Sequence, residues 1–316
     1  MSKSWQSSAP ASAAEGRHGA RGYFYIAAAC LCWGLAAALA QAVFKGKLLP
    51  RSGGEAISPL VLSQTRTSIT FLLLLPMLAV ARAPRRSALF PAGKALIVSL
   101  LVGAFGISAS NFFYYFSIQK TTVATGIILQ YLCPIWVLAY LVARSLQQAT
   151  ASRIVGVLLA VTGCALAVGI GPGTLRYNAA GVAAGLAASF AFAFYNIAAQ
   201  RLLITADRWS VFLAAMAGAT VFWTFVNPPW KLVSAHFPAA QWEFLIAFAV
   251  FSVLVPYSFY FAGLKHLDAT RAVVTACLEP VFAIALATFT VGEAITAVQA
   301  AGVACVLAGT IVVQRS

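Results

Sequence analysis

The chain has 316 residues, of which 61% are hydrophobic and 9% are charged, and its mean hydropathy is +0.88. A soluble domain carries roughly 25% charged residues because its surface faces water, so this composition excludes an ordinary soluble protein and predicts an integral membrane protein. The net charge of +14 does not indicate nucleic-acid binding, because the basic residues lie in short links between apolar runs, where they orient helices.

The chain begins with a polar segment and continues with apolar runs. Residues 1–21 are rich in serine and alanine and are predicted to form a disordered cytoplasmic tail. Each apolar run approaches the roughly 20 residues that a helix needs to cross a bilayer, and the runs are continuous rather than alternating, which favours helices over a barrel. The fifth and seventh runs are short, so the sequence does not fix the residues at which these two spans begin and end. In chain order the ten predicted spans are Tyr23–Phe44, Leu60–Val80, Ala95–Ile118, Ala124–Val142, Ile154–Ile170, Ala180–Leu202, Val211–Val226, Trp242–Leu264, Ala272–Val291 and Thr296–Val313.

The distribution of basic residues predicts the orientation of these spans. With the N-terminus inside, 14 lysine and arginine residues fall on the inner side and 6 on the outer side, while Arg66 lies within a span. Inner loops of membrane proteins carry the excess of positive charge. The sequence therefore predicts a multi-pass protein of the cell inner membrane with both termini in the cytoplasm.

An internal repeat divides the ten spans into two sets of five. Because five is odd, the second half enters the membrane from the opposite side, and inverted repeats of this kind are typical of secondary transporters. The predicted halves are 22–170 and 171–316. Four pairs of identical residues lie 146 positions apart without a gap: Tyr114 and Tyr260, Pro134 and Pro280, Gly156 and Gly302, and Gly163 and Gly309.

Several motifs resemble the EamA-type branch of the drug/metabolite transporter superfamily, over most of Tyr23–Val313. They are Leu278-Glu279-Pro280-Val281, the run Val291-Gly292-Glu293-Ala294-Ile295-Thr296 with Gln299 and Gly302, the degenerate copy Gln130-Tyr131-Leu132-Cys133-Pro134-Ile135, the pair Trp33-Gly34, and Arg66. The resemblance implies an all-α fold of ten transmembrane helices in two inverted five-helix repeats, and export of small metabolites. Amino-acid exporters, among them the YddG-like exporters of aromatic amino acids, give the expected substrate class. Cys133 stands where the second half has Glu279, so the halves are not chemically equivalent.

Glu279 is the only acidic residue deep within a predicted span. A carboxylate at that depth costs several kcal/mol unless it is paired, protonated or reached by water. It is therefore predicted to bind a substrate ammonium or a coupled proton. The structural alternative is a carboxyl group that bonds a neighbouring helix beside the kink at Pro280. The sequence leaves both readings open.

Other polar and aromatic residues within the spans complete the predicted site. Uncharged polar side chains often bond across helices as glue, and buried phenols need a partner, so packing is the alternative for each of them. The predicted substrate-binding residues are Asn111, Tyr114, Gln130, Tyr131, Tyr195, Asn196, Tyr257, Tyr260 and Glu279. The residues predicted to act in gating or in the scaffold are Trp33, Arg66, Pro134 and Pro280.

A secondary transporter explains these features better than the other classes do. An intramembrane enzyme would need several converging catalytic groups, and a channel would show rings of charge or a filter loop. Nucleotide sugars are the less favoured cargo, because such anions would need several inward-facing cations. No metal, nucleotide or cofactor motif is present. The expected partners are a small-molecule substrate, membrane lipids and, if transport is coupled, protons.

Overall fold

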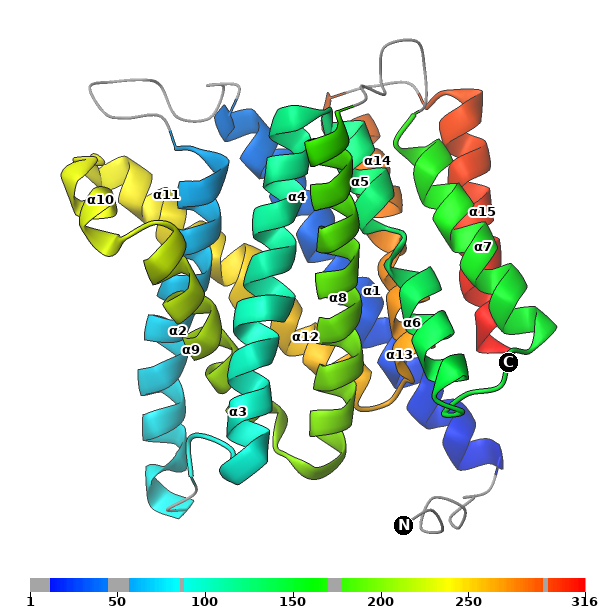
Figure 1. Cartoon of the computed structure of the whole chain (residues 1–316), viewed down its shortest axis with the longest axis horizontal. Helices are drawn as coiled ribbons and strands as arrows, with labels where there is room; N and C mark the ends of the chain where they lie inside the picture. Colours follow the sequence, from blue (N-terminus) through cyan, green and yellow to red (C-terminus); the bar gives the residue numbers. More distant parts are fainter. Residues whose placement is uncertain (1–11, 45–56, 86–87, 170–177, 292–294, 316) are drawn as a thin grey trace.

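The computed structural model describes residues 12–44, 57–85, 88–169, 178–291 and 295–315. These residues form helices joined by short links (Figure 1). The helices are α1 (Ser12–Phe44), α2 (Pro59–Arg82), η1 (Ala83–Arg85), α3 (Gly93–Leu101), η2 (Val102–Ser108), α4 (Ala109–Lys120), α5 (Val123–Gln130), α6 (Cys133–Ala143), α7 (Ala151–Ala167), α8 (Ala179–Thr205), α9 (Arg208–Val226), α10 (Pro229–Ser234), α11 (Ala239–Ala249), η3 (Val250–Leu254), α12 (Val255–Leu264), α13 (Ala269–Ala276), α14 (Leu278–Val291) and α15 (Ala297–Gln314).

Ten apolar helical segments confirm the predicted fold class. Within the described residues, nine are long and apolar enough to cross a membrane, and α7 is a shorter apolar helix of 17 residues. One boundary was wrong: α1 begins at Ser12, so residues 12–21 are helical, although they were assigned to a disordered tail. Alanine, glutamate and arginine in this segment are good helix formers, which allows the helix to extend beyond the apolar run. Residues 1–11 of the predicted tail and 292–294 of the last motif lie outside the described residues.

The two halves share their helix breaks and their irregular turns. The fourth span breaks at Tyr131 and Leu132 between α5 and α6, and the ninth breaks at Cys277, which is 146 residues after Tyr131. The third and eighth spans each contain a π-helical segment: η2 shifted by 146 residues is 248–254, and η3 is Val250–Leu254. Such irregularities cost backbone hydrogen bonds and often occur at functional sites. Their matching positions extend the repeat from residue identities to backbone geometry.

Each half packs its first helix into the other half. Helix α1 lies against α12, α13 and α14, which belong to the eighth and ninth spans. Helix α8 is the first helix of the second half, and it lies against α4, α5 and α6 of the third and fourth spans. Figure 1 shows α8 beside α4 and α1 among the helices of the second half. The halves are therefore interlocked around one interface.

The fifth and tenth spans, α7 and α15, meet through glycines that the repeat relates. A Cβ on Gly156 would come within 3.0 Å of the carbonyl oxygen of Gly309, and one on Gly163 within 2.8 Å of that of Gly302. The offset of 146 relates Gly156 to Gly302 and Gly163 to Gly309. One contact is thus the image of the other, which is the signature of a two-fold, self-complementary interface between antiparallel helices.

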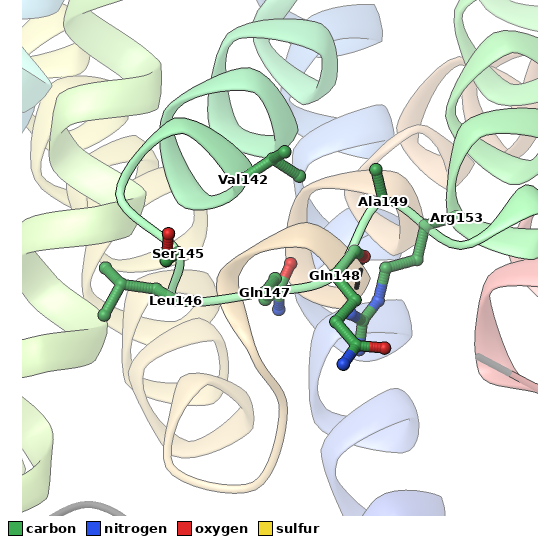
Figure 2. A pocket seen from close by; sticks show the side chains of 7 residues that line it. All are labelled: Val142, Ser145, Leu146, Gln147, Gln148, Ala149 and Arg153. Atoms are coloured by element: carbon green, nitrogen blue, oxygen red, sulfur yellow. Dashed lines mark hydrogen bonds between the residues drawn. The ribbon is translucent and has the colours of Figure 1, made fainter.

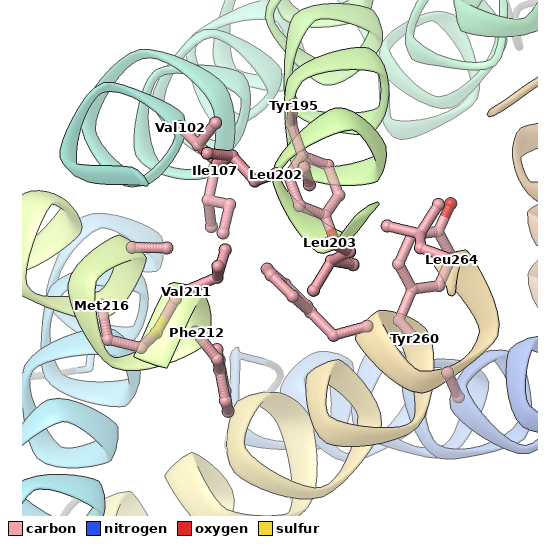
Figure 3. Packing of buried hydrophobic residues seen from close by; sticks show 14 of the residues in the cluster. Val102, Ile107, Tyr195, Leu202, Leu203, Val211, Phe212, Met216, Tyr260 and Leu264 are labelled. Carbon is pink, nitrogen blue, oxygen red and sulfur yellow. The ribbon is translucent and has the colours of Figure 1, made fainter. Parts of the chain in front are cut away.

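A hydrophobic core holds η2, α8, α9 and α12 together (Figure 3). Tyr195 and Leu203 come from α8, Phe212 from α9, and Tyr260 and Leu264 from α12. Phe212 stacks on Tyr257 with ring centroids 6.2 Å apart. This core holds α8 and α12 together, and these two helices carry Tyr195, Asn196, Tyr257 and Tyr260 of the predicted site.

Candidate functional site

The breaks in the fourth and ninth spans bring Tyr131 and Glu279 together. Tyr131 Oη donates a hydrogen bond of 2.9 Å to Glu279 Oε2, so residues 148 positions apart meet across the two halves. Glu279 lies in the first turn of α14, where the positive end of the helix dipole favours a negative charge. Glu279 is intermediate in burial, and Tyr131 is the one side chain of the described residues that donates a hydrogen bond to its carboxylate.

Gly34 allows α1 to approach the backbone beside Glu279. A Cβ at Gly34 would lie 3.0 Å from the backbone nitrogen of Ala283 and 3.3 Å from the carbonyl oxygen of Glu279. The Sγ of Cys30, one turn earlier, donates toward the Ala276 carbonyl oxygen at 3.6 Å. These contacts with α1 hold the start of α14 in place.

A second polar group lies around Arg66. Arg66 Nη2 donates to Asn111 Oδ1 at 2.6 Å, and Asn111 Nδ2 donates to the carbonyl oxygen of Ile107 at 2.8 Å. The Asn111 side chain also interacts with the phenol of Tyr257, which is its repeat equivalent 146 residues later. Residues that the repeat relates can touch only near the pseudo-two-fold axis. This group therefore lies where the two halves meet.

The two groups belong to one electrostatic environment. The positive charge of Arg66 acts on Glu279, on Tyr114 and on Tyr257. The side chains of Arg66, Asn111, Tyr114, Tyr257 and Glu279 are all partly exposed although they lie well inside the spans. They come from α2, α4, α12 and α14, so both halves contribute to the cluster.

Aromatic rings cover the sides of this cluster. Trp33 meets Tyr257 edge-on at 5.3 Å and Tyr260 at 5.2 Å, and Tyr114 lies 5.2 Å from Tyr115. Such surfaces suit apolar or aromatic substrate groups. We call the set Trp33, Arg66, Asn111, Tyr114, Tyr115, Tyr131, Tyr257 and Glu279 the central cluster.

The remaining predicted residues lie beside the central cluster rather than in it. Tyr260 Oη donates to Asn196 Oδ1 at 2.6 Å, and Tyr195, Asn196 and Tyr260 have no exposed surface. Gln130 Nε2 donates to Ser110 Oγ at 3.3 Å and thereby joins α5 to α4. Pro134 is buried near the start of α6, and Pro280 follows Glu279 directly in α14.

Two polar links at opposite ends of α2 and α9 were not predicted. At one end, Gln64 and Asn227 exchange two hydrogen bonds of 2.6 Å each. At the other end, Arg82 forms an ion pair with Asp207, which caps α9 through the backbone N–H groups of Trp209 and Ser210. Asp207 directly precedes a helix, and this could have suggested the cap. No sequence signal indicates the partners.

The environment of Asp207 changes its pKa. Burial opposes ionisation, but the backbone N–H of Ser210 and the guanidinium of Arg82 outweigh it, so the pKa of Asp207 lies below its ordinary value of 3.8. The Arg82–Asp207 link is therefore charged at neutral pH.

A separate surface pocket of about 620 Å³ lies at the link between α6 and α7 (Figure 2). Arg153 Nη1 donates to the carbonyl oxygen of Gln148, and Gln147 Oε1 accepts from Thr270. Figure 2 shows Gln147, Gln148 and Arg153 along the loop that lines this pocket. The pocket is lined by one segment of one half, whereas the central cluster draws residues from both halves. Among the described residues, no three or more His, Cys, Asp or Glu side chains gather as metal ligands would.

Comparison with known sequences identifies the family. The sequence model of the EamA-like transporter family matches residues 20–169 and 179–315. The chain belongs to this family. This EamA-like chain is thus a multi-pass membrane transporter of the drug/metabolite transporter superfamily, as its motifs predicted.

Relatives of this transporter agree with the assignment. The uncharacterized inner membrane transporter YicL of Salmonella typhimurium is 23% identical over 227 residues, which cover 69% of this chain and 72% of that protein. A protein of known crystal structure superposes with a TM-score of 0.69 at 19% identity, over 94% of this chain and 96% of its own. At that identity the likeness shows the fold alone.

Proposed function

We propose that this transporter exports small metabolites, in the first place amino acids including aromatic ones, across the bacterial inner membrane by alternating access. The observation that carries the proposal is the central cluster, in which one cation and one carboxylate lie among aromatic rings at the interface of the two halves. Inverted-repeat transporters bind their substrates at such an interface, beside discontinuous helices. The breaks at Tyr131 and Cys277 are of this kind.

The same argument ranks the alternatives. Other small metabolites or drugs remain the second candidate, since an aromatic wall also accepts them. Nucleotide sugars and similar anions rank lower, because Arg66 is the only cation of the central cluster. No catalytic residue is proposed. The excess of basic residues on one side of the spans supports an orientation with both termini in the cytoplasm. A proton is the proposed coupling ion, with Glu279 as its carrier.

Flux into liposomes that contain the purified chain tests the proposal. The panel comprises aromatic, aliphatic and charged amino acids, a nucleotide sugar and a lipophilic cation, each with and without a pH gradient. We expect downhill exchange of neutral amino acids above protein-free liposomes and a reduced rate in the Glu279→Gln variant. Glu243→Gln, an exposed carboxylate at the start of α11, is the matched control and should match the wild type. Export restricted to the sugar or the cation would contradict the amino-acid assignment.

A further inference from the structure

We infer that Arg66 and Glu279 are the two poles of one binding site for zwitterions, in which Arg66 holds a carboxylate and Glu279 holds an ammonium group. The inference rests on the proposed transport function. It adds that the substrate is a zwitterion and names the residue that binds each of its two charged groups. It gives Arg66 a direct role in substrate binding, where the sequence suggested gating or scaffolding.

Arg66 retains unused capacity to bind an anion. A guanidinium has five N–H donors, and here one nitrogen bonds Asn111 while the buried Nε has no partner. No carboxylate of the described residues lies within ion-pairing distance of Arg66. A cation within a span normally pairs with an anion or with carbonyl groups. The planar guanidinium matches a carboxylate in two parallel bonds.

Glu279 retains the complementary capacity. A carboxylate has about four acceptor positions, and Tyr131 is the one side-chain donor that the described residues supply. The charges of Arg66 and Glu279 act on each other but form no ion pair. Each charge therefore lacks the strong partner that its position within the membrane demands, and one bound molecule with two opposite charges satisfies both.

The two poles lie at neighbouring depths in the membrane. At 1.5 Å per residue, the Cα of Arg66 lies about 9 Å below one edge of its span and that of Glu279 about 13 Å below the opposite edge, so their depths differ by about 8 Å in a 30 Å core. A long arginine side chain and a glutamate side chain can both extend into the layer between these depths, where a small molecule can meet both charged groups.

The charge balance of the central cluster selects neutral molecules. With one cation and one carboxylate, the cluster has no net charge, so a bound anion or cation would leave one pole uncompensated. A zwitterion compensates both poles, and its side chain can lie against Trp33 and Tyr257, whose rings meet at 5.3 Å. Neutral aromatic or aliphatic amino acids therefore fit better than acidic or basic ones.

Binding of three related probes to the purified chain in nanodiscs tests each pole separately. Phenylalanine carries both charges, phenylalanine amide lacks the carboxylate, and N-acetylphenylalanine lacks the ammonium; calorimetry at pH 6.5 keeps free α-amino groups protonated. We expect both blocked probes to bind the wild type at least about tenfold more weakly than phenylalanine, because each leaves one buried charge unpaired.

The variants should lose these preferences one at a time. Arg66→Gln should bind phenylalanine and its amide within about threefold of each other and still discriminate against the N-acetyl probe. Glu279→Gln should bind phenylalanine and N-acetylphenylalanine within about threefold of each other and still discriminate against the amide. Compared with Arg66→Gln, Arg66→Lys should restore part of the preference for the free carboxylate. Arg201→Gln and Glu243→Gln, at exposed positions, should keep the wild-type pattern.

The outcomes separate this inference from the transport proposal. If the chain transports amino acids but binds phenylalanine and both blocked probes equally well, the site with two poles is refuted and the transport proposal stands. The expected binding pattern without flux would support the site and contradict transport. If Arg66→Gln does not fold, the three probes on the wild type and on Arg66→Lys still decide, since equal binding of phenylalanine and its amide refutes the role of Arg66.

Discussion

The glycine contact between α7 and α15 gives a sharp test of the fold. We predict that Gly302→Ala destabilises the chain, because the added Cβ would clash with the backbone nitrogen of Ala167 and lie 2.8 Å from the carbonyl oxygen of Gly163 and from the carbonyl carbon of Leu166. All three are backbone atoms, so no side-chain rotation relieves the contact. The two helices would have to separate.

The size of the effect follows from two opposing contributions. Overpacking of a well-packed interface costs about 1–3 kcal/mol, and the backbone partners place Gly302 at the upper end. Replacing glycine by alanine within a helix returns about 1 kcal/mol. We therefore expect a loss of about 2 kcal/mol in the free energy of unfolding. Gly156→Ala should lose less, because its nearest contacts are 3.0 and 3.1 Å.

Gly19→Ala is the matched control, because a Cβ at Gly19 meets nothing within 4 Å. It should gain up to about 1 kcal/mol from helix propensity alone. Unfolding of the three variants in the same detergent, followed by tryptophan fluorescence, gives the ranking Gly19→Ala, Gly156→Ala, Gly302→Ala from most to least stable. Equal stability of Gly302→Ala and Gly19→Ala would refute the close contact and the two-fold interface built on it.

Three further predictions concern orientation, coupling and acid stability. A membrane-impermeant maleimide added to intact cells should label Val233→Cys and spare Ala92→Cys and the parent chain; labelling of both new cysteines from outside would contradict the inverted topology. Glu279→Gln should lower downhill exchange, because it removes the ammonium-binding carboxylate, and should also abolish stimulation of the remaining flux by a pH gradient if Glu279 carries the proton; unchanged coupling would remove it from the proton-carrying role. The pKa of Asp207 is lowered, so its ionised carboxylate stabilises the fold above the ordinary value of 3.8, and this contribution is lost as pH falls through the lower folded-state value. Asp207→Asn should keep the cap and lose at most about 1 kcal/mol at pH 7, with a shallower acid transition in thermal unfolding, and Asp207→Ala should lose about 1 kcal/mol more.

The spans and the repeat could be predicted because each depends on signals with a simple period or a fixed offset. The offset that matches Pro134 to Pro280 also places the two helix breaks at Tyr131 and Cys277. Apolar runs cannot reveal the π-helical segments η2 and η3, since every residue there is apolar or small whether the turn is α or π. The start of α1 was missed for a related reason, because helix propensity extends the helix beyond its hydrophobic part.

The candidate site was only partly predictable. Depth within a span singled out Glu279 and Arg66, whereas the helix break at Tyr131 was seen only in the structure. The direction of each side chain depends on helix rotation, which polar residues in an apolar helix do not determine. Residue type and position within a span therefore did not distinguish the buried Tyr195, Asn196 and Tyr260 from Tyr114 and Tyr257, which are partly exposed.

The backbone of this transporter is nearly symmetric, but its chemistry is not. Under the 146-residue offset, Tyr131 corresponds to Cys277 and Glu279 to Cys133. Tyr131 bonds Glu279 across the two breaks, whereas the equivalent pair, Cys133 and Cys277, consists of two buried thiols. Two equivalent backbones permit two equivalent arrangements of the halves, as alternating access requires. In the site that we propose, a single carboxylate on one half and a single guanidinium on the other would give a bound zwitterion one orientation, so charges that the repeat does not duplicate would determine how the substrate binds.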